Sequence, residues 1–183
     1  MKRLFLVLIL FLVPVSAQER LSLAEQKEVL AKIGPCKTNG ILPDKKCTPG
    51  LANPKVTQAN IKRTICVAGF TKTIRPPVSY TGPLKTAMLS KYGFAFKPQN
   101  FEFDHLISLQ LGGHPSDLKN LWPEPYKGKS GEFGTRIKDK FENYLKYEIC
   151  KRRMTLEEAQ RQISTNWFKN WKDASEPSGA RNP

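Results

Sequence analysis

Apolar residues recur every three to four positions in four parts of the chain, and this spacing predicts four amphipathic helices. They are expected over about 23–33, 83–93, 135–151 and 155–167. A capping-box pattern opens the first at Ser22 and the last at Thr155. A shorter helix is expected from Thr57 toward Thr64, because a threonine hydroxyl suits the N-cap position.

A strand is predicted over 101–111, where apolar and polar residues alternate. The residues on one side would be Phe103, His105, Ile107, Leu109 and Leu111. A glycine pair ends this segment, and a second strand is expected over 118–122, before two prolines. Residues 67–80 hold β-formers and an Arg-Pro-Pro run, so they are expected to be extended or turn. The order over 101–151 is therefore strand, loop, strand, basic loop and helix.

The first 17 residues have the pattern of a secretory signal peptide. Lys2 and Arg3 precede an apolar run over Leu4–Val13, and Val15–Ala17 supplies small residues for cleavage. The run is too short for a membrane span, which needs about 20 residues. We therefore expect cleavage after Ala17, a secreted or periplasmic protein and no stable membrane insertion afterwards. An uncleaved anchor is the alternative.

The 183-residue chain is strongly basic, with 30 Lys and Arg against 16 Asp and Glu and a formal net charge of +14. Loss of Lys2 and Arg3 with the signal peptide lowers this charge to +12. Such a bias favours polyanionic partners, either nucleic acid or an anionic envelope polymer. A basic composition kept for solubility is the alternative, and no protein partner is indicated.

Four cysteines lie in the exported part, and an even number in an oxidising compartment predicts two disulfides. Of three possible pairings we favour Cys36–Cys47 with Cys66–Cys150, because the first pair brackets a Gly/Pro/Asp loop that can bend back on itself. The second would close a loop of 84 residues (150 − 66), worth roughly 4 kcal/mol on the chain-entropy model. Structural zinc is the competing use, although the chain has no C-x-x-C and two histidines.

The chain is expected to form one folded domain of the α+β class, stabilised by disulfides. A small hairpin-plus-helix core would be surrounded by short helices and loops. The expected divisions are a signal peptide at 1–17, an N-terminal helix and disulfide-pinned loop at 18–52, a main domain at 53–171 with its core at 101–151, and a disordered tail at 172–183.

Three side chains near the expected hairpin suit phosphodiester hydrolysis, which requires a base, a cation and a rigid scaffold. His105 is a candidate general base because imidazole titrates near neutral pH, and a buried, satisfied histidine is the alternative. Asp104 is a hard oxygen ligand suited to Mg²⁺. Asn120 can donate and accept, and so tie the loop to the strand. Neighbouring strand residues point to opposite faces, so Asp104 and His105 can share one phosphate only if the strand bends.

This stretch resembles the HNH endonucleases of the ββα-metal nuclease superfamily. It matches D-H-[LI]-x-P-L-x-x-G-G … N-L through Asp104, His105, Leu106, Leu109, Gly112, Gly113, Asn120 and Leu121. It is also similar, over about 53–167, to a group of exported bacterial HNH-like proteins. The shared motifs are N-P-x-V-T at 53–57, T-I-C at 64–66, R-P-P at 75–77, Y-T-x-x-L-K at 80–85, N-L-W-P-E-P at 120–125 and K-D-x-x-E-N at 138–143.

The resemblance implies a small ββα-metal (HNH-like) core and an endonuclease that uses one divalent ion. Mg²⁺ is expected first, with Mn²⁺, Ni²⁺ or Zn²⁺ as alternatives. In this family pattern His105 activates water, Asp104 binds the metal and Asn120 holds the histidine-bearing loop. Ser108 stands where the family usually has proline, which softens the end of the strand without removing a catalytic atom.

The helix lacks the metal-binding histidine that many relatives carry, since no histidine follows His114. His114 itself is expected to be a loop residue. The remaining candidates on the helix are Asp139, which we prefer, then Glu142, with Asn143 also present. Lys138 lies four residues before Glu142, so a plain surface ion pair is the alternative to a metal ligand.

Five basic residues near the expected site are candidates to hold phosphates: Lys127, Lys129, Arg136, Lys138 and Lys140. A solvated helix face is the alternative. Tyr126 is a candidate to stack on a base, whereas Trp122 is expected in the core. None of these residues suggests base-specific contacts, so sequence selectivity is expected to be weak.

The sequence thus favours a metal-dependent endonuclease that hydrolyses phosphodiester bonds of DNA, with RNA as an alternative substrate. A second hypothesis is a catalytically inactive HNH-like module that binds nucleic acid or an anionic envelope polymer. A third is a small disulfide-bonded structural protein in which Asp104 and His105 are buried and paired, with no groove at His105.

Overall fold

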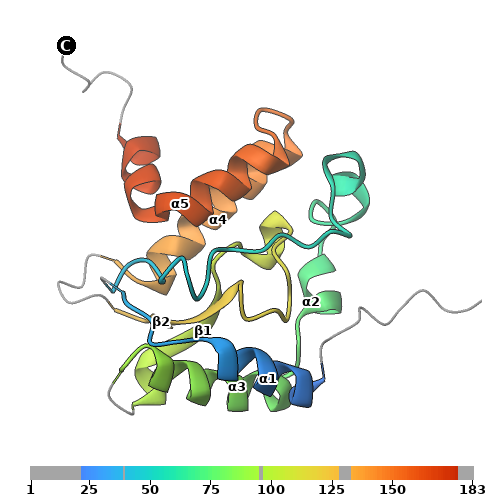
Figure 1. The fold of residues 1–183 in the computed structure, drawn as a ribbon. Coiled ribbons are helices and arrows are strands. Elements are labelled where there is room, and N and C mark those ends of the chain that lie inside the picture. Colours follow the sequence, from blue (N-terminus) through green and yellow to red (C-terminus); the bar gives the residue numbers. More distant parts are fainter. Residues whose placement is uncertain (1–21, 39, 95–96, 128–132, 177–183) are drawn as a thin grey trace, which may run out of the picture.

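The computed structural model describes residues 22–38, 40–94, 97–127 and 133–176, so the expected signal peptide lies outside the described residues (Figure 1). The elements follow the chain as α1 (Leu23–Lys32), η1 (Gln58–Arg63), α2 (Phe70–Ile74), α3 (Val78–Lys91), η2 (Pro98–Asn100), β1 (Phe101–His105), η3 (Leu109–Leu111), β2 (Leu121–Pro125), α4 (Thr135–Cys150) and α5 (Leu156–Ser175), where η marks a 3₁₀ helix. The expected α+β class is confirmed.

The antiparallel β1–β2 hairpin lies in the middle of the molecule, between α4 and α5 on one side and α1 and α3 on the other (Figure 1). Two apolar clusters fill the spaces beside it. One joins α4 and α5 to η1 and η3 around Phe141, Leu145 and Trp167. The other joins α1 and α3 to β2 around Met88 and Trp122. The hairpin packs in the second cluster through Trp122 and Phe103, and the loop that follows β1 packs in the first through Ile107 and Leu111.

The apolar stripes predicted for the last two helices are confirmed. The buried residues are Phe141, Leu145 and Ile149 on α4, and Leu156, Ala159, Ile163 and Trp167 on α5. Thr155 caps α5, because its hydroxyl oxygen accepts a hydrogen bond from the backbone N–H of Glu158. The disordered tail was expected from Lys172, but α5 continues to Ser175, so that boundary is wrong. Residues 177–183 lie outside the described residues.

Both strands differ from their expected bounds. β1 ends at His105 rather than at Leu111. The side chain of Asn120 forms hydrogen bonds with the backbone N–H and C=O of Ile107, and the chain then turns into η3. β2 covers 121–125 rather than 118–122 and includes both prolines.

The register explains why β2 tolerates these prolines. Pro123 lies opposite Phe103, while the hydrogen-bonded pair Leu106–Asn120 lies an odd number of positions away. Bonded and non-bonded positions alternate in an antiparallel pair. Pro123, and Pro125 two residues later, therefore occupy positions whose N–H would point away from β1, so no ladder bond is lost.

The segment 67–80, expected to be extended or turn, contains α2 and the start of α3. Pro77 is the N-cap of α3, which begins at Val78. Pro83 was expected to open this helix and instead lies inside it. The helix persists around the proline because its buried stripe, Leu84 and Met88, packs in the cluster shared with α1 and β2.

The expected disulfides are both present. Cys36–Cys47 closes the loop after α1, and Cys66–Cys150 joins the segment after η1 to the end of α4. The indole N–H of Trp167 donates to the backbone oxygen of Ile41, 3.0 Å away. The loop expected to be pinned by a disulfide is therefore also held against α5.

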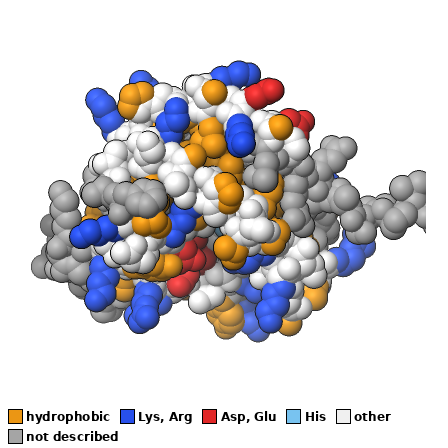
Figure 2. Space-filling model, turned by 90° about the horizontal axis from the view of Figure 1, so that it is seen from below, with side chains coloured by type: hydrophobic (Ala, Val, Ile, Leu, Met, Phe, Trp, Pro, Cys, Tyr) orange, Lys and Arg blue, Asp and Glu red, His pale blue; other side chains and the backbone are white. Residues whose placement is uncertain are grey.

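The surface view in Figure 2 shows Lys and Arg side chains spread over one face, around a small group of acidic side chains near its centre. This distribution agrees with the basic composition. Across the described ranges, no helix is both long enough and apolar enough to cross a membrane.

Candidate functional site

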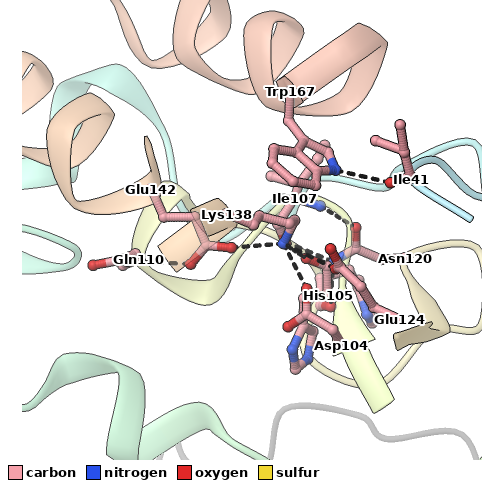
Figure 3. Close-up of polar contacts among 11 residues, drawn as sticks. Ile41, Asp104, His105, Ile107, Gln110, Asn120, Glu124, Lys138, Glu142 and Trp167 are labelled. Carbon is pink, nitrogen blue, oxygen red and sulfur yellow. Dashed lines mark hydrogen bonds and ion pairs between the residues drawn. The ribbon is translucent and has the colours of Figure 1, made fainter. Parts of the chain in front are cut away.

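Lys138 connects α4 to β1 through its side chain. Its ammonium lies 2.5 Å from Oδ2 of Asp104, 2.6 Å from Oε1 of Glu142 and 2.9 Å from the backbone oxygen of His105 (Figure 3). An ammonium has three N–H groups, so all three are used. The Lys138 side chain is only 1 % exposed. The expected pair of Lys138 and Glu142 therefore exists, but it is buried and not on the surface.

The charges of this cluster stabilise one another. Burial opposes the charge on Lys138, but the carboxyl groups of Asp104, Glu142 and Glu124 outweigh it and raise the pKa of the ammonium well above its usual value. Burial also acts against the Asp104 carboxylate, yet the attraction of Lys138 lowers the pKa of Asp104 overall. Lys138 and Asp104 therefore form a buried ion pair at neutral pH.

Glu124 of β2 is the least solvated carboxyl of the cluster. It is 1 % exposed and lies 3.9 Å from the Lys138 ammonium, and its two oxygens accept no hydrogen bond from the described residues. Burial, with the negative charge of Asp104, raises the pKa of Glu124 well above its usual value. Burial thus favours the protonated form of Glu124 more strongly than in a solvated glutamate.

His105 is buried at the end of β1, with 4 % of its surface exposed. Its Nε2 lies 2.9 Å from the backbone oxygen of Pro115. Burial lowers the pKa of His105 to about 4, against the attraction of Asp104. The ring is therefore neutral at pH 7, and its single proton sits on Nε2, because only a protonated nitrogen bonds to a carbonyl oxygen. In this tautomer Nδ1 carries the lone pair of the ring.

A pocket of about 240 Å³ opens beside His105. Its lining comes from the N-terminal end of α3, the segment before it and β1: Arg75, Pro76, Val78, Thr81, Gly82, Lys85, Phe103 and His105. Arg75 is exposed, and the half-buried Lys85 donates from Nζ to the backbone oxygen of Phe101 at 2.7 Å. The pocket thus combines one neutral imidazole with two cationic side chains.

Asn120 holds the loop after β1, as expected. Its Oδ1 accepts from the backbone N–H of Ile107 at 2.9 Å, and its Nδ2 donates to the backbone oxygens of Ile107 and His114, each at 2.9 Å. Gly113 allows this close packing, since a Cβ there would lie 1.7 Å from the Ile107 oxygen. Nδ1 of His114 accepts from the backbone N–H of Asp117 at 3.0 Å, so His114 is the loop residue that was expected.

The other predicted site residues divide into exposed and buried groups. Lys127, Arg136, Lys140 and Asp139 are exposed, and Lys129 lies outside the described residues. Lys138 was expected to hold phosphates. That assignment is wrong in the structure, because its ammonium is buried and its hydrogen bonds are all directed at protein oxygens.

The side chains do not fit a divalent ion as they are arranged. Asp104 and Glu142 belong to the predicted ligand set, and they face the Lys138 ammonium. Asp139, the preferred helix ligand, has an exposed side chain, but partial desolvation of its carboxyl group and the nearby charge of Asp104 raise its pKa. Within the described ranges, no group of three or more His, Cys, Asp or Glu side chains is placed to hold a metal ion. The Mg²⁺ site stays a prediction.

Three residues of the site were not predicted from the sequence, namely Glu124, Arg75 and Lys85, and Lys138 was predicted with a different role. One signal was present for Lys138. It precedes Phe141 by three residues and Leu145 by seven, the spacing of the buried stripe of α4. A lysine on an apolar stripe indicates a buried charge with partners elsewhere in the fold. No comparable signal pointed to Glu124, since it lies between two prolines.

Comparison with known proteins gave no match to any family model, curated protein or solved structure. The resemblance to the HNH endonucleases therefore depends on the motif residues alone. The structure adds an antiparallel hairpin followed by α4, with Asp104, His105 and Asn120 gathered at the end of β1.

Proposed function

We propose that this protein is an exported endonuclease that cleaves phosphodiester bonds in nucleic acid with weak sequence selectivity, and that His105 is its general base. The observation that carries the proposal is the state of His105 in its pocket. The ring is neutral, it is fixed by the Pro115 oxygen, and it shares the pocket with Arg75 and Lys85.

The geometry supports two parts of such a reaction. The free lone pair on Nδ1 can take a proton from an attacking hydroxyl or water, while the Nε2 bond keeps the ring in one orientation. Arg75 and Lys85 can offset the negative charge of a phosphate in the same pocket. Lys127, Arg136 and Lys140 are exposed and remain candidates to contact other phosphates of the polymer. DNA is the first expected substrate and RNA the alternative.

The test is cleavage by the oxidised protein without its first 17 residues. Supercoiled plasmid and single-stranded RNA are incubated with the wild type and with His105→Gln. Gln retains an amide donor for the Pro115 oxygen but has no base, so we expect a loss of at least about 100-fold in rate. Lys169→Ala, an exposed change on α5, is the matched control. Equal rates for wild type and His105→Gln, in a protein that cleaves, would rule out the proposed base.

Binding without cleavage is the second candidate function, and a specific observation favours it. The Lys138 ammonium already satisfies Asp104 and Glu142, which leaves these carboxylates without a metal. Salt-sensitive binding of DNA, or of an anionic polymer such as polyphosphate, with no cleavage under Mg²⁺, Mn²⁺, Ni²⁺ or Zn²⁺, would favour this function. The third hypothesis, a purely structural protein, agrees with the burial of His105 and the ion pair of Asp104, whereas the pocket beside His105 argues against it.

A further inference from the structure

We infer that the ammonium of Lys138 is the permanent cation of this site, occupying the position among Asp104, Glu142 and Glu124 that a divalent metal ion would otherwise take. The inference concerns the site of the proposed function, and its meaning for catalysis rests on that function. The binding of a cation is nevertheless measurable without any cleavage.

The contacts of Lys138 are those of a bound cation. Three oxygens from two elements, β1 and α4, converge on one nitrogen at 2.5–2.9 Å, and a fourth carboxyl lies 3.9 Å away. Carboxylate and backbone oxygens are also the ligands that Mg²⁺ and Ca²⁺ prefer. Gln110 donates to the second oxygen of Glu142 at 3.2 Å, which fixes that carboxylate toward the nitrogen. The oxygens of the cluster thus surround the ammonium of Lys138, a side chain of the same protein.

A divalent ion from solution would have to displace this ammonium. Lys138 is 1 % exposed, and its nitrogen has three bonded acceptors, all inside the cluster. Leaving a buried ammonium without partners is strongly unfavourable. The lysine is also tethered to α4, so it lies beside the carboxylates whenever the protein is folded. Both effects predict that the wild type does not bind divalent ions here at millimolar concentrations.

The same contacts limit what Lys138 does in the proposed reaction. Its three N–H groups are used, so it neutralises the carboxylates without reaching a substrate phosphate. Lys138 is therefore a positioning residue that joins Asp104 and the His105 backbone to α4. Arg75 and Lys85, which line the pocket, are left to contact the phosphate. Cleavage by this site is then insensitive to EDTA.

The experiment measures cation binding by calorimetry, with Mn²⁺ and Ca²⁺ as probes. We expect no binding to the oxidised wild type. Lys138→Ala removes the ammonium, and we expect one site per chain with half-saturation below about 1 mM, the range of weak protein calcium sites. Asp104→Asn added to Lys138→Ala should abolish that site. Lys146→Ala, another lysine on α4, is the matched control and should bind no ion.

Three results would overturn the inference. The first is stoichiometric Mn²⁺ binding by the wild type that Asp104→Asn removes. The second is a folded Lys138→Ala that binds neither ion. The third result concerns the case in which Lys138→Ala does not fold without added metal. In that case, if Mn²⁺ restores folding neither to Lys138→Ala nor to Lys138→Ser, the inference is overturned. Restored folding, detected by circular dichroism, would support the inference as binding does.

Cleavage assays separate this inference from the proposed function. Cleavage that survives EDTA and is lost in His105→Gln supports both. Metal-dependent cleavage with Mn²⁺ bound at Asp104 supports the function and overturns the role of Lys138. Absence of any cleavage, with no ion bound by the wild type and one bound by Lys138→Ala, supports the role of Lys138 and contradicts the function.

Discussion

The ammonium of Lys138 lies 2.5 Å from the carboxylate of Asp104, a contact between α4 and β1 that is buried on the lysine side. Removing one member of a buried ion pair leaves an uncompensated charge. We expect Lys138→Met to lower the free energy of unfolding by about 3–5 kcal/mol. Urea unfolding of the oxidised protein measures the loss.

A compensated variant provides the control for this prediction. Lys138→Met combined with Asp104→Asn and Glu142→Gln removes the charges together, and it should recover a large part of the lost stability. Equal stability of the single and the triple variant would show that the ion pair does not account for the loss.

His105 predicts a defined dependence of stability on pH. Burial lowers its pKa to about 4, whereas the unfolded chain has the ordinary value of about 6.5. Between these values the unfolded state binds the additional proton, so stability falls as the pH falls, with a slope of about 1.4 kcal/mol per pH unit. The contribution is fully present above pH 6.5 and is lost at about pH 4.

Comparison with His105→Gln isolates this effect, because the raised pKa of Glu124 acts with the opposite sign. The wild type should lose more stability than the variant between pH 6.5 and 4, measured by urea unfolding at fixed salt. Parallel curves for the two proteins would contradict a neutral, buried His105.

The same lowered pKa predicts the acid limb of any cleavage reaction. A base that is protonated only near pH 4 stays active well below the ordinary pKa of histidine. We expect the rate of cleavage to fall at about pH 4, and not at 6.5. A rate profile of RNA or plasmid cleavage from pH 3.5 to 8 measures this, and a midpoint at 6.5 would show that His105 is solvated during the reaction.

The buried hydrogen bonds of Asn120 predict that removal of its side chain destabilises the protein. Its amide makes hydrogen bonds with the backbone of Ile107 and His114, and it is fully buried. Asn120→Ala should lower the free energy of unfolding by about 2–4 kcal/mol, because buried backbone groups lose their partners. Asn170→Ala is the control, because it removes one half-buried hydrogen bond from the side-chain amide of Asn170 to the backbone oxygen of Gln162. Its expected loss of unfolding free energy is below about 1.5 kcal/mol. Thermal and urea unfolding compare the two, and similar losses would contradict a special role of Asn120.

Arg75 and Lys85 predict the salt dependence of nucleic-acid binding. If both neutralise a phosphate in the pocket, each change to alanine should weaken binding and reduce the slope of log affinity against log salt by about one. Fluorescence anisotropy with a labelled oligonucleotide at several salt concentrations measures both quantities. Lys169→Ala on α5 removes the same charge elsewhere, and a slope reduced equally by this control would locate binding outside the pocket.

Local patterns predicted the bounds of α1 and α4 to within one residue, whereas α2 and the start of α3 were not predicted. The apolar stripe of α4 and the capping threonine of α5 depend on residues three or four positions apart, and both are confirmed. The two disulfides were also predicted, because a short Gly/Pro/Asp loop favours one pairing and leaves the other by elimination.

Features that depend on packing between elements far apart in the sequence were not predicted by local patterns. By local rules the two prolines of β2 predict the end of a strand, whereas their tolerance within β2 depends on the register with β1. Pro83 predicts the start of a helix, although packing against α1 and β2 extends α3 to residues before it. In each case the deciding contact joins segments that are far apart in the sequence.

The sequence by itself determined the order of strand, strand and helix and the gathering of Asp104, His105 and Asn120 at one loop, and it favoured the disulfide pairing that the structure has. These follow from local spacing and from residue chemistry. Only the tertiary structure decided that Lys138 fills the carboxylate cluster, because its contact with Asp104 spans 34 residues and depends on how α4 docks on β1. Burial then makes that contact obligatory, since an ammonium in the core requires oxygen partners that solvent does not supply.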